Sequence, residues 1–229
     1  MTGSAAPAAL GAEDSIAPRR RSFPVVLSAP SGTGKTSVGK AILKRFPELA
    51  FSVSATTRPP RAGEVEGRDY EFLSEEAFLR GVDGGVFAEW ARVHAHYYGT
   101  PRDAVERPLG EGRHVLLDVD VQGARSLLSL YPFAVSIFLL PPSRRAMAER
   151  LRARGTEDEQ ALRERLAGAL QEVAQAKLYQ YVLVNDSLGS TIDLFEHILR
   201  AEEQRRSRIA NWTPWIEAAF RAAGGGERT

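Results

Sequence analysis

The pattern of apolar and polar positions divides most of the chain into alternating strands and helices. Short continuous apolar runs predict buried strands, and apolar residues three or four positions apart, such as Val38, Ile42 and Phe46, predict helices. Buried strands are expected within 24–30, 48–56, 114–120, 133–142 and 179–186. Helices are expected over 34–46, 121–131, 143–179 and 190–209, the last with Ser190 as its N-cap.

This alternation predicts an α/β protein in which helices cover both faces of a parallel sheet. Residues 57–112 interrupt it, because they contain glycines, prolines, aromatic residues and only short apolar runs. We therefore expect a core formed by 22–56 and 113–207, with a mixed α/β subdomain inserted at 57–112. The Ala/Pro-rich segment 1–21 is expected to be a disordered tail, and 208–229 a C-terminal extension with a short helix.

The sequence SAPSGTGKT at 28–36 joins the first predicted strand to the first predicted helix and nearly matches the phosphate-binding loop GxxxxGK[ST]. Such a turn directs successive backbone N–H groups at phosphate oxygens, and the positive end of the following helix dipole strengthens the attraction. Lys35 is placed to reach β- and γ-phosphates, and the Thr36 hydroxyl to hold Mg²⁺. The expected ATP contacts in the loop are Ala29, which replaces the usual glycine, Pro30, Ser31, Gly32, Thr33, Gly34, Lys35 and Thr36.

Composition narrows the possible classes of function. The 229-residue chain has 30 Lys and Arg against 29 Asp and Glu, so its net charge indicates neither a nucleic-acid nor a membrane partner. It has no cysteine, which excludes disulfides, thiolate metal sites and a cysteine nucleophile. No apolar run approaches the roughly 18 residues of a membrane span, and the N-terminus lacks a secretory pattern. We expect a cytoplasmic protein; a monomer and a homo-oligomer fit the sequence equally.

Several further stretches resemble guanylate kinases in their order and approximate spacing, over about residues 23–202. They are FSVSATTRPPRAGEVEGRDYEF (51–72), FAEWARVHAHYYGTP (87–101), LLDVDVQGA (116–124), PPSRRAMAERLRARG (141–155) and VLVND (182–186). The resemblance implies an enzyme that transfers the γ-phosphoryl group of ATP to GMP with Mg²⁺, giving ADP and GDP. It also implies that Asn185 lies beside the adenine of ATP.

The same resemblance implies a GMP site built largely from the inserted segment. Arg58 and Arg61 lie on a proline-stiffened loop, and two guanidinium groups suit the paired oxygens of a phosphate monoester. Glu89 lies between apolar neighbours, where its carboxylate can accept the N1–H and 2-amino hydrogens that guanine offers and adenine does not. The other implied GMP ligands are Tyr70 and Tyr98 at the phosphate, Ser54 and Thr100 as hydroxyl donors to guanine O6, Gly99 and Asp120.

Asp118 and Asp120 alternate along the strand predicted at 114–120, so both side chains are expected to face the same side. They lie at the carboxyl end of the strand, where open α/β sheets bind ligands. One interpretation places Asp118 at Mg²⁺, which makes Thr36 and Asp118 the expected metal ligands, and Asp120 at the monophosphate. The two roles could also be shared or exchanged.

Arginines are dense over 150–165, within a segment of about 143–170 that resembles the helical lid covering the triphosphate in the family. Phosphoryl transfer depends on positioning and on cationic stabilisation of the transferring group. By the resemblance, the catalytic residues are Lys35, Arg58, Arg154 and Arg165. The remaining arginines of this segment, Arg150, Arg152 and Arg163, fit a lid and a solvated charged helix face equally.

Two other functions share part of this pattern. A kinase for a ribosyl phosphate would keep the phosphate loop but lack the guanine reader, whereas a non-catalytic module that binds phosphopeptides would typically lose Lys35. The sequence also departs from the family at Ala95-His96, where Gly-Asn is usual. His94 and His96 have no evident third ligand, which argues against a zinc site.

Overall fold

The computed structural model describes residues 20–93, 95–152 and 159–210, together with 213, 216, 217, 220 and 221. Most of the expected tail and of the expected C-terminal extension therefore lies outside the described residues. The chain forms two compact units, one of residues 22–200 and one of residues 1–21 with 201–229. In the smaller unit, Arg20 forms a bridge with Ile209, and the buried Arg208 and Glu202 lie 2.8 Å apart. All the predicted site residues belong to the larger unit.

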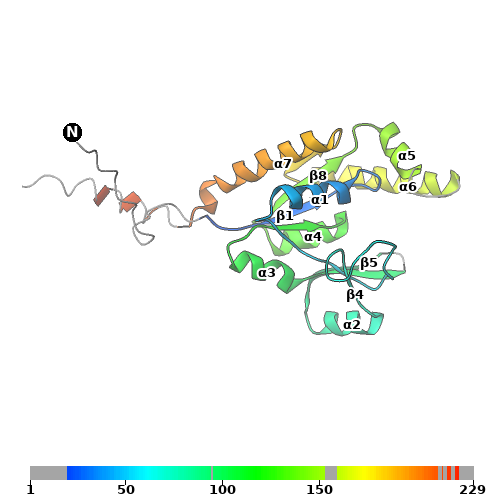
Figure 1. Ribbon diagram of the computed structural model, residues 1–229, viewed down its shortest axis with the longest axis horizontal. Helices are drawn as coiled ribbons and strands as arrows, with labels where there is room; N and C mark the ends of the chain where they lie inside the picture. The colour runs from blue at the N-terminus through cyan, green and yellow to red at the C-terminus, as the bar shows by residue number, and fades with distance from the viewer. Residues whose placement is uncertain are drawn as a thin grey trace, which may run out of the picture. The chain divides into compact units, whose positions relative to one another are not determined.

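The centre of the larger unit is a five-stranded sheet whose neighbouring strands all run parallel (Figure 1). Its order is β2 (Ala50–Phe51), β7 (Val115–Asp118), β1 (Pro24–Ser28), β8 (Val135–Leu140) and β9 (Tyr181–Val184). Alternate side chains of β1 point to opposite faces, because the side-chain period of a strand is two. Val25 and Leu27 enter one core cluster and Val26 enters another.

Helices cover both faces of this sheet, which confirms the predicted fold class. The cluster of Val25 includes residues of α1 (Lys35–Arg45) and α7 (Leu188–Glu203), and the cluster of Val26 includes residues of α4 (Val121–Leu130). The other core helices are α5 (Arg144–Arg152) and α6 (Glu159–Val173), followed by the 3₁₀ turn η1 (Ala174–Leu178); a second turn, η2 (Arg206–Arg208), lies in the smaller unit.

The predicted N-cap of the last helix is wrong. The helix begins at Leu188, two residues before Ser190, and the Ser187 hydroxyl accepts the backbone N–H of Ser190 at 3.2 Å. A cap bonds the N–H group two or three positions into the helix, so Ser187 is the cap and Ser190 lies in the first turn.

A second, four-stranded sheet is formed largely by the segment that interrupted the alternation. Its order is β4 (Glu71–Phe72), β3 (Ala55–Thr56), β6 (His96–Pro101) and β5 (Phe87–Val93), and it is accompanied by α2 (Glu75–Asp83) and α3 (Arg102–Gly110). Its small core packs the α2 side chain Phe78 against Phe87 at 4.4 Å between ring centroids. The loop 57–70 has no helix or strand, only an isolated bridge between Glu66 and Tyr70.

The single strand predicted at 48–56 is also wrong. The structure divides this run into β2, which pairs with β7 of the parallel sheet, and β3, which pairs with β6 of the second sheet. Ala50, Ala55 and Thr56 are buried and Phe51 is partly buried, so the run resembles one apolar strand although the chain passes from one sheet to the other between Phe51 and Ala55. Ser54 lies in this passage and immediately precedes β3.

Candidate functional site

The loop between β1 and α1 has the backbone that a phosphate-binding turn requires. Gly32 and Gly34 have φ angles of 84° and 95°, in the left-handed region that favours glycine. A Cβ on Gly32 would also lie 2.8 Å from Leu151 Cγ. Ala29 is buried and packs into the core cluster of Val25 and Leu27, so its methyl group is part of the hydrophobic core.

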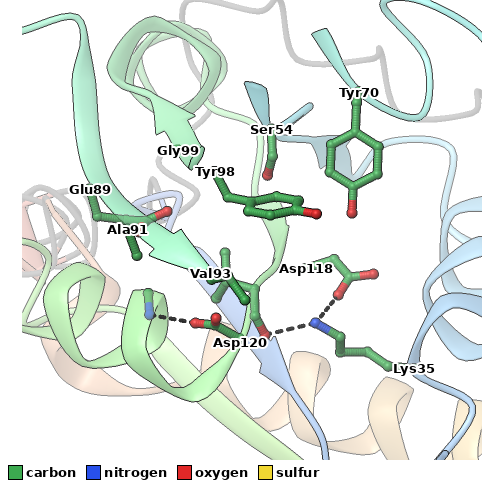
Figure 2. Close-up of a pocket in the computed structure, with 12 residues that line it drawn as sticks. Lys35, Ser54, Tyr70, Glu89, Ala91, Val93, Tyr98, Gly99, Asp118 and Asp120 are labelled. Atoms are coloured by element: carbon green, nitrogen blue, oxygen red, sulfur yellow. Dashed lines mark hydrogen bonds and ion pairs between the residues drawn. The ribbon is translucent and has the colours of Figure 1, made fainter. Parts of the chain in front are cut away.

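Lys35 begins α1 and is held at the carboxyl end of β7. Its Nζ lies 2.5 Å from Asp118 Oδ1 and donates to the Val119 carbonyl oxygen at 2.8 Å (Figure 2). The parallel pairing of β1 with β7 brings these groups together, since it places Leu27 beside Asp118. Asp118 and Thr36 line the same cavity, so two of the predicted groups that favour a hard cation share one space.

Residues distant in sequence brace the phosphate loop. The buried Asn185 donates to the Thr33 carbonyl oxygen at 2.7 Å, and Arg150 donates to the same oxygen at 2.9 Å. The Glu172 carboxylate accepts the Ser31 backbone N–H at 3.1 Å, and burial is the main cause that raises its pKa. Asn185 was expected beside adenine; its described side-chain contacts are with the Thr33 carbonyl oxygen of the loop and with the Thr191 hydroxyl.

The structure describes only part of the predicted lid. Arg165 is half-buried on α6, whereas Arg154 lies outside the described residues. Arg150, for which the sequence favoured neither of two interpretations, contacts both the phosphate loop and the Asn185 carbonyl oxygen, the latter at 3.3 Å.

A cavity of about 210 Å³ connects this loop region to the second sheet. Figure 2 shows Glu89 at one end, and Lys35 and Asp118 at the other. The hydroxyl of Tyr70 points toward Asp118. The full lining is Lys35, Ser54, Tyr70, Glu89, Ala91, Val93, Tyr98, Gly99, Asp118, Val119, Asp120 and Gly123, which includes six of the nine predicted GMP ligands.

The end of the pocket at Glu89 is shaped by close packing. Glu89 and Thr100 face each other across β5 and β6, and the Thr100 hydroxyl donates to Glu89 Oε1 at 2.6 Å. A Cβ on Gly123 of α4 would lie 3.0 Å from Glu89 Oε2, and a Cβ on Gly99 would lie 3.0 Å from the Phe78 and Phe87 rings. Burial is the main cause that raises the pKa of Glu89 above its usual range, and the charge of Asp120 adds to the effect.

The other end of the pocket is polar. Burial, followed by the nearby Asp118 charge, raises the pKa of Tyr70, so its hydroxyl remains a hydrogen-bond donor. Asp120 lies beyond the end of β7 and is the N-cap of α4, where it accepts the Gly123 N–H at 2.7 Å. Asp120 therefore combines a place in the pocket lining with a structural role in the helix.

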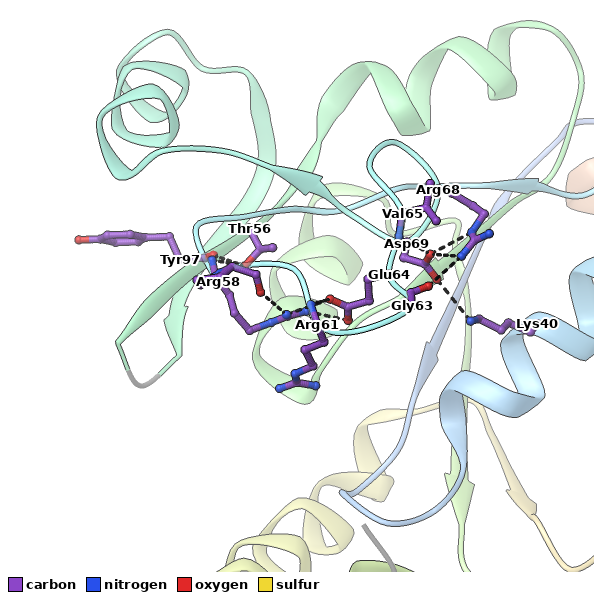
Figure 3. A network of polar contacts seen from close by, with 11 residues as sticks. Lys40, Thr56, Arg58, Arg61, Gly63, Glu64, Val65, Arg68, Asp69 and Tyr97 are labelled. Atoms are coloured by element: carbon purple, nitrogen blue, oxygen red, sulfur yellow. Dashed lines mark hydrogen bonds and ion pairs between the residues drawn. The ribbon is translucent and has the colours of Figure 1, made fainter. Parts of the chain in front are cut away.

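Arg58 and Arg61 do not line this pocket, but they lie on the adjoining loop (Figure 3). The Arg58 guanidinium is paired with the Glu64 carboxylate through two bonds of 2.9 Å. Arg61 lines a second cavity, of about 770 Å³, which shares Ser54, Tyr70 and Asp118 with the first.

Three contributing residues were missed by sequence reasoning. Glu64 lies in the stretch 51–72 that resembles guanylate kinases, and an acid six positions after Arg58 was the available signal. Gly123 gave a weaker signal, a glycine in a predicted helix next to Asp120. Glu172 gave none, since it meets Ser31 from 141 positions away. In the described part of the chain, no three His, Cys, Asp or Glu side chains are grouped to hold a metal, and His94 lies outside that part.

None of the helices in the described residues is long and apolar enough to cross a membrane. A family model described as guanylate kinase matches residues 21–202. A guanylate kinase of Nitratidesulfovibrio vulgaris is 51% identical over 174 residues, which are 76% of this chain and 84% of that protein. One of Symbiobacterium thermophilum is 45% identical over 80% of this chain and 87% of that protein. The crystal structure of guanylate kinase from Anaplasma phagocytophilum superposes with a TM-score of 0.77 at 34% identity, over 89% of this chain and 98% of that one.

Proposed function

This chain belongs to the guanylate kinase family, and we propose that it transfers the γ-phosphoryl group of ATP to GMP, producing ADP and GDP. Membership makes it a kinase, an enzyme of nucleotide-dependent phosphoryl transfer. The observation that carries the choice of acceptor is the single cavity that joins Glu89 to Lys35 and Asp118.

The positions of the polar groups at the two ends of this cavity support GMP as the occupant. With guanine at Glu89, a carboxylate faces the N1–H and 2-amino donors, and the 5′-phosphate extends toward Tyr70 and the phosphate loop. Adenine offers no such pair of donors. A site that hydrogen-bonds its substrate rejects an analogue lacking those groups by up to about 10⁴–10⁵-fold, because its buried polar groups are left unpaired. A ligand that binds in this direction presents its phosphate to the ATP loop.

The donor end follows from the loop geometry. The N–H groups of the turn and the N-terminus of α1 bind the β- and γ-phosphates of ATP. Lys35 leaves its ion pair with Asp118 and binds these phosphates instead. Thr36 and Asp118 are the residues that would hold Mg²⁺, which would neutralise negative charge on the ATP phosphates. Their oxygen atoms and shared cavity fit that ion.

Phosphoryl transfer here needs no general base. The attacking atom is an oxygen of the GMP phosphate, which is already ionised at neutral pH, so the protein supplies alignment and positive charge. Arg58 and Arg61 bind the acceptor phosphate, and Arg154 and Arg165 stabilise the transferring group. The cytoplasmic location expected from the sequence stays a prediction.

A coupled assay of ADP release tests this function. The chain is supplied with ATP, Mg²⁺ and one acceptor at a time, namely GMP, AMP, UMP or ribose 1,5-bisphosphate. Of the four acceptors, we expect rapid turnover only with GMP. Preference for ribose 1,5-bisphosphate would indicate a ribosyl phosphate kinase, and GMP binding without turnover would indicate a non-catalytic module.

A further inference from the structure

The Arg58 side chain is held by partners on its own loop, and the Tyr98 side chain of β6 also interacts with it. Its Nη1 donates to Glu64 Oε2 at 2.9 Å and to the Pro59 carbonyl oxygen at 2.6 Å, and its Nη2 donates to Glu64 Oε1 at 2.9 Å (Figure 3). The guanidinium carbon also lies 5.3 Å from the centre of the Tyr70 ring. Both charged side chains are largely shielded from water, with exposures of 10% for Arg58 and 19% for Glu64.

This pairing occupies only one edge of the guanidinium. An arginine carries five N–H donors in a planar fork. Glu64 takes the edge formed by Nη1 and Nη2, while the edge formed by Nε and the second hydrogen of Nη2 is not used in these three bonds. Such an edge provides two parallel donors, which match two oxygens of a phosphate.

We propose that Glu64 is a positioning residue for the kinase reaction, which holds Arg58 so that its remaining edge receives the phosphate of GMP. The inference rests on the proposed function and extends it to a residue outside the pocket lining. A flexible arginine that is already ordered loses less conformational freedom when the phosphate arrives, and this preorganisation favours binding.

Glu64 acts through Arg58 and not on the substrate. A carboxylate in contact with a phosphate would repel it, and both Glu64 oxygens are already bonded to Arg58. Oε2 accepts in addition the Arg61 backbone N–H at 2.7 Å. One side chain therefore links the two arginines that are expected at the acceptor phosphate.

The neighbouring carboxylates of the loop provide a contrast. Asp69 accepts the Val65 N–H at 3.0 Å, and Glu66 accepts the Phe72 N–H at 3.0 Å. Asp69 also pairs with the Arg68 side chain at 2.7 Å. The described bonds of Asp69 and Glu66 are to groups other than Arg58 and Arg61, whereas Glu64 bonds both of these arginines. Glu66→Gln is therefore a matched control, which removes a loop carboxylate whose described bond is to the Phe72 backbone and not to Arg58 or Arg61.

The test compares Glu64→Gln with wild type and with Glu66→Gln. Glutamine keeps the size of the side chain, but its amide nitrogen is a donor and would face a donor of Arg58. We expect kcat/KM for GMP to fall at least tenfold in Glu64→Gln, with the KM for ATP changed less than twofold. Glu66→Gln should stay within twofold of wild type in both values. Glu64→Asp, which keeps the charge on a shorter stem, should recover part of the loss.

A double-mutant cycle with Arg58→Ala separates positioning from a general structural role. If Glu64 acts through Arg58, adding Glu64→Gln to Arg58→Ala should change kcat/KM for GMP by less than twofold. Additive losses in the cycle, an unchanged Glu64→Gln enzyme, or an equal rise in both KM values would each overturn the inference. If Glu64→Gln does not fold, Glu64→Asp carries the same comparison. Wild type without GMP turnover would instead refute the proposed function.

Discussion

At the scale of single residues, the pocket depends on charged groups held where water is scarce. Glu89 is the clearest case, because burial raises its pKa and so disfavours the ionised form that guanine recognition needs. The Thr100 hydroxyl offsets part of this effect by donating to the carboxylate. Recognition of the base therefore comes at the expense of stability at this position.

Glu89→Gln should separate these two effects. Glutamine can still accept from Thr100, but its amide group would oppose a donor of guanine, and an unpaired buried polar group costs about 1–3 kcal/mol. We expect kcat/KM for GMP to fall at least about tenfold, with the KM for ATP little changed. A variant that used GMP as well as wild type would place the guanine site elsewhere.

The same substitution predicts a change in stability with a definite sign. A carboxyl whose folded-state pKa is raised favours folding most at low pH, and this contribution is lost as pH rises through that pKa. At neutral pH the ionised Glu89 is therefore unfavourable, and Glu89→Gln should melt at or above the wild-type Tm. Calorimetry at pH 7 checks this, and a clearly lower Tm would contradict the account.

The raised pKa of Glu89 also predicts a pH dependence of binding. As pH falls toward that pKa, which lies above the ordinary value of a glutamate, the carboxyl takes up a proton and loses an acceptor. The KM for GMP should therefore rise on the acid side in wild type, after correction for protonation of the GMP phosphate. The KM for GMP should depend less on pH in Glu89→Gln. Identical pH profiles in the two proteins would contradict the assignment.

Lys35 gives the corresponding prediction at the donor end. Lys35→Ala should lower kcat by about 10²–10³-fold or more, because removal of one contact that stabilises developing charge typically has this effect. Lys40→Ala is the control on the same helix, since the Lys40 side chain is 67% exposed and its ion pair with Asp69, at 3.3 Å, is expected to contribute little. Comparable activity of the two variants would refute the loop assignment.

At the scale of helices and strands, the sequence predicted most elements of the parallel-sheet core, but not the individual elements of the inserted segment nor the division of 143–179 into α5, α6 and η1. The strands β1, β7 and β8 were found because buried strands are continuous apolar runs. The edge strand β9 was also found from its apolar run, although Val182 and Val184 are about half exposed. The division of 48–56 between two sheets was missed, because hydrophobicity records burial and not the identity of the pairing strand. In the loop 57–70, the arginines were recognised by resemblance, whereas the bonds of Glu64 depend on a fold with no periodic pattern.

The packing of α4 against β5 predicts an unusual effect of a glycine substitution. Alanine normally stabilises a helix interior by about 0.8–1.0 kcal/mol relative to glycine. In Gly123→Ala the added methyl group would lie 3.0 Å from Glu89 Oε2 and displace that carboxylate. We expect the KM for GMP to rise about fivefold or more, as expected for roughly 1 kcal/mol of lost binding, without a large loss of stability.

Gly168→Ala is the matched control for this prediction. Gly168 lies within α6, and a Cβ there would meet no atom within 4 Å. This variant should gain stability with an unchanged KM for GMP. Equal KM values in the two variants, measured beside their Tm values, would show that Gly123 does not shape the base end of the pocket.

At the scale of the whole molecule, the sequence predicted the fold class and most of the pocket lining, but not how its parts are joined. Lys35 and Asp118 meet because β1 and β7 are neighbours in the sheet, which follows from the parallel α/β topology. The contact between Glu172 and Ser31 joins segments far apart in the chain, and no local pattern predicts it. Site roles rested largely on resemblance, because a single sequence does not reveal which side chains converge.

Binding of both substrates should bring the acceptor and donor parts together. Arg58 and Arg61 lie on the loop next to the second sheet, whereas Lys35 lies on the core, and transfer requires the two phosphates to be aligned. Small-angle X-ray scattering with GMP and a non-hydrolysable ATP analogue should give a smaller radius of gyration than the free protein. An unchanged radius would argue against closure.

The measurement that tests the central claim most directly is the ratio of kcat/KM for GMP to that for IMP in the wild-type protein. IMP keeps the sugar, the phosphate, O6 and N1–H, and lacks only the 2-amino group that Glu89 is proposed to accept. Loss of one partner of a buried charged group predicts a ratio of at least about tenfold. Equal use of GMP and IMP would contradict the proposal that Glu89 recognises guanine through this pair of donors.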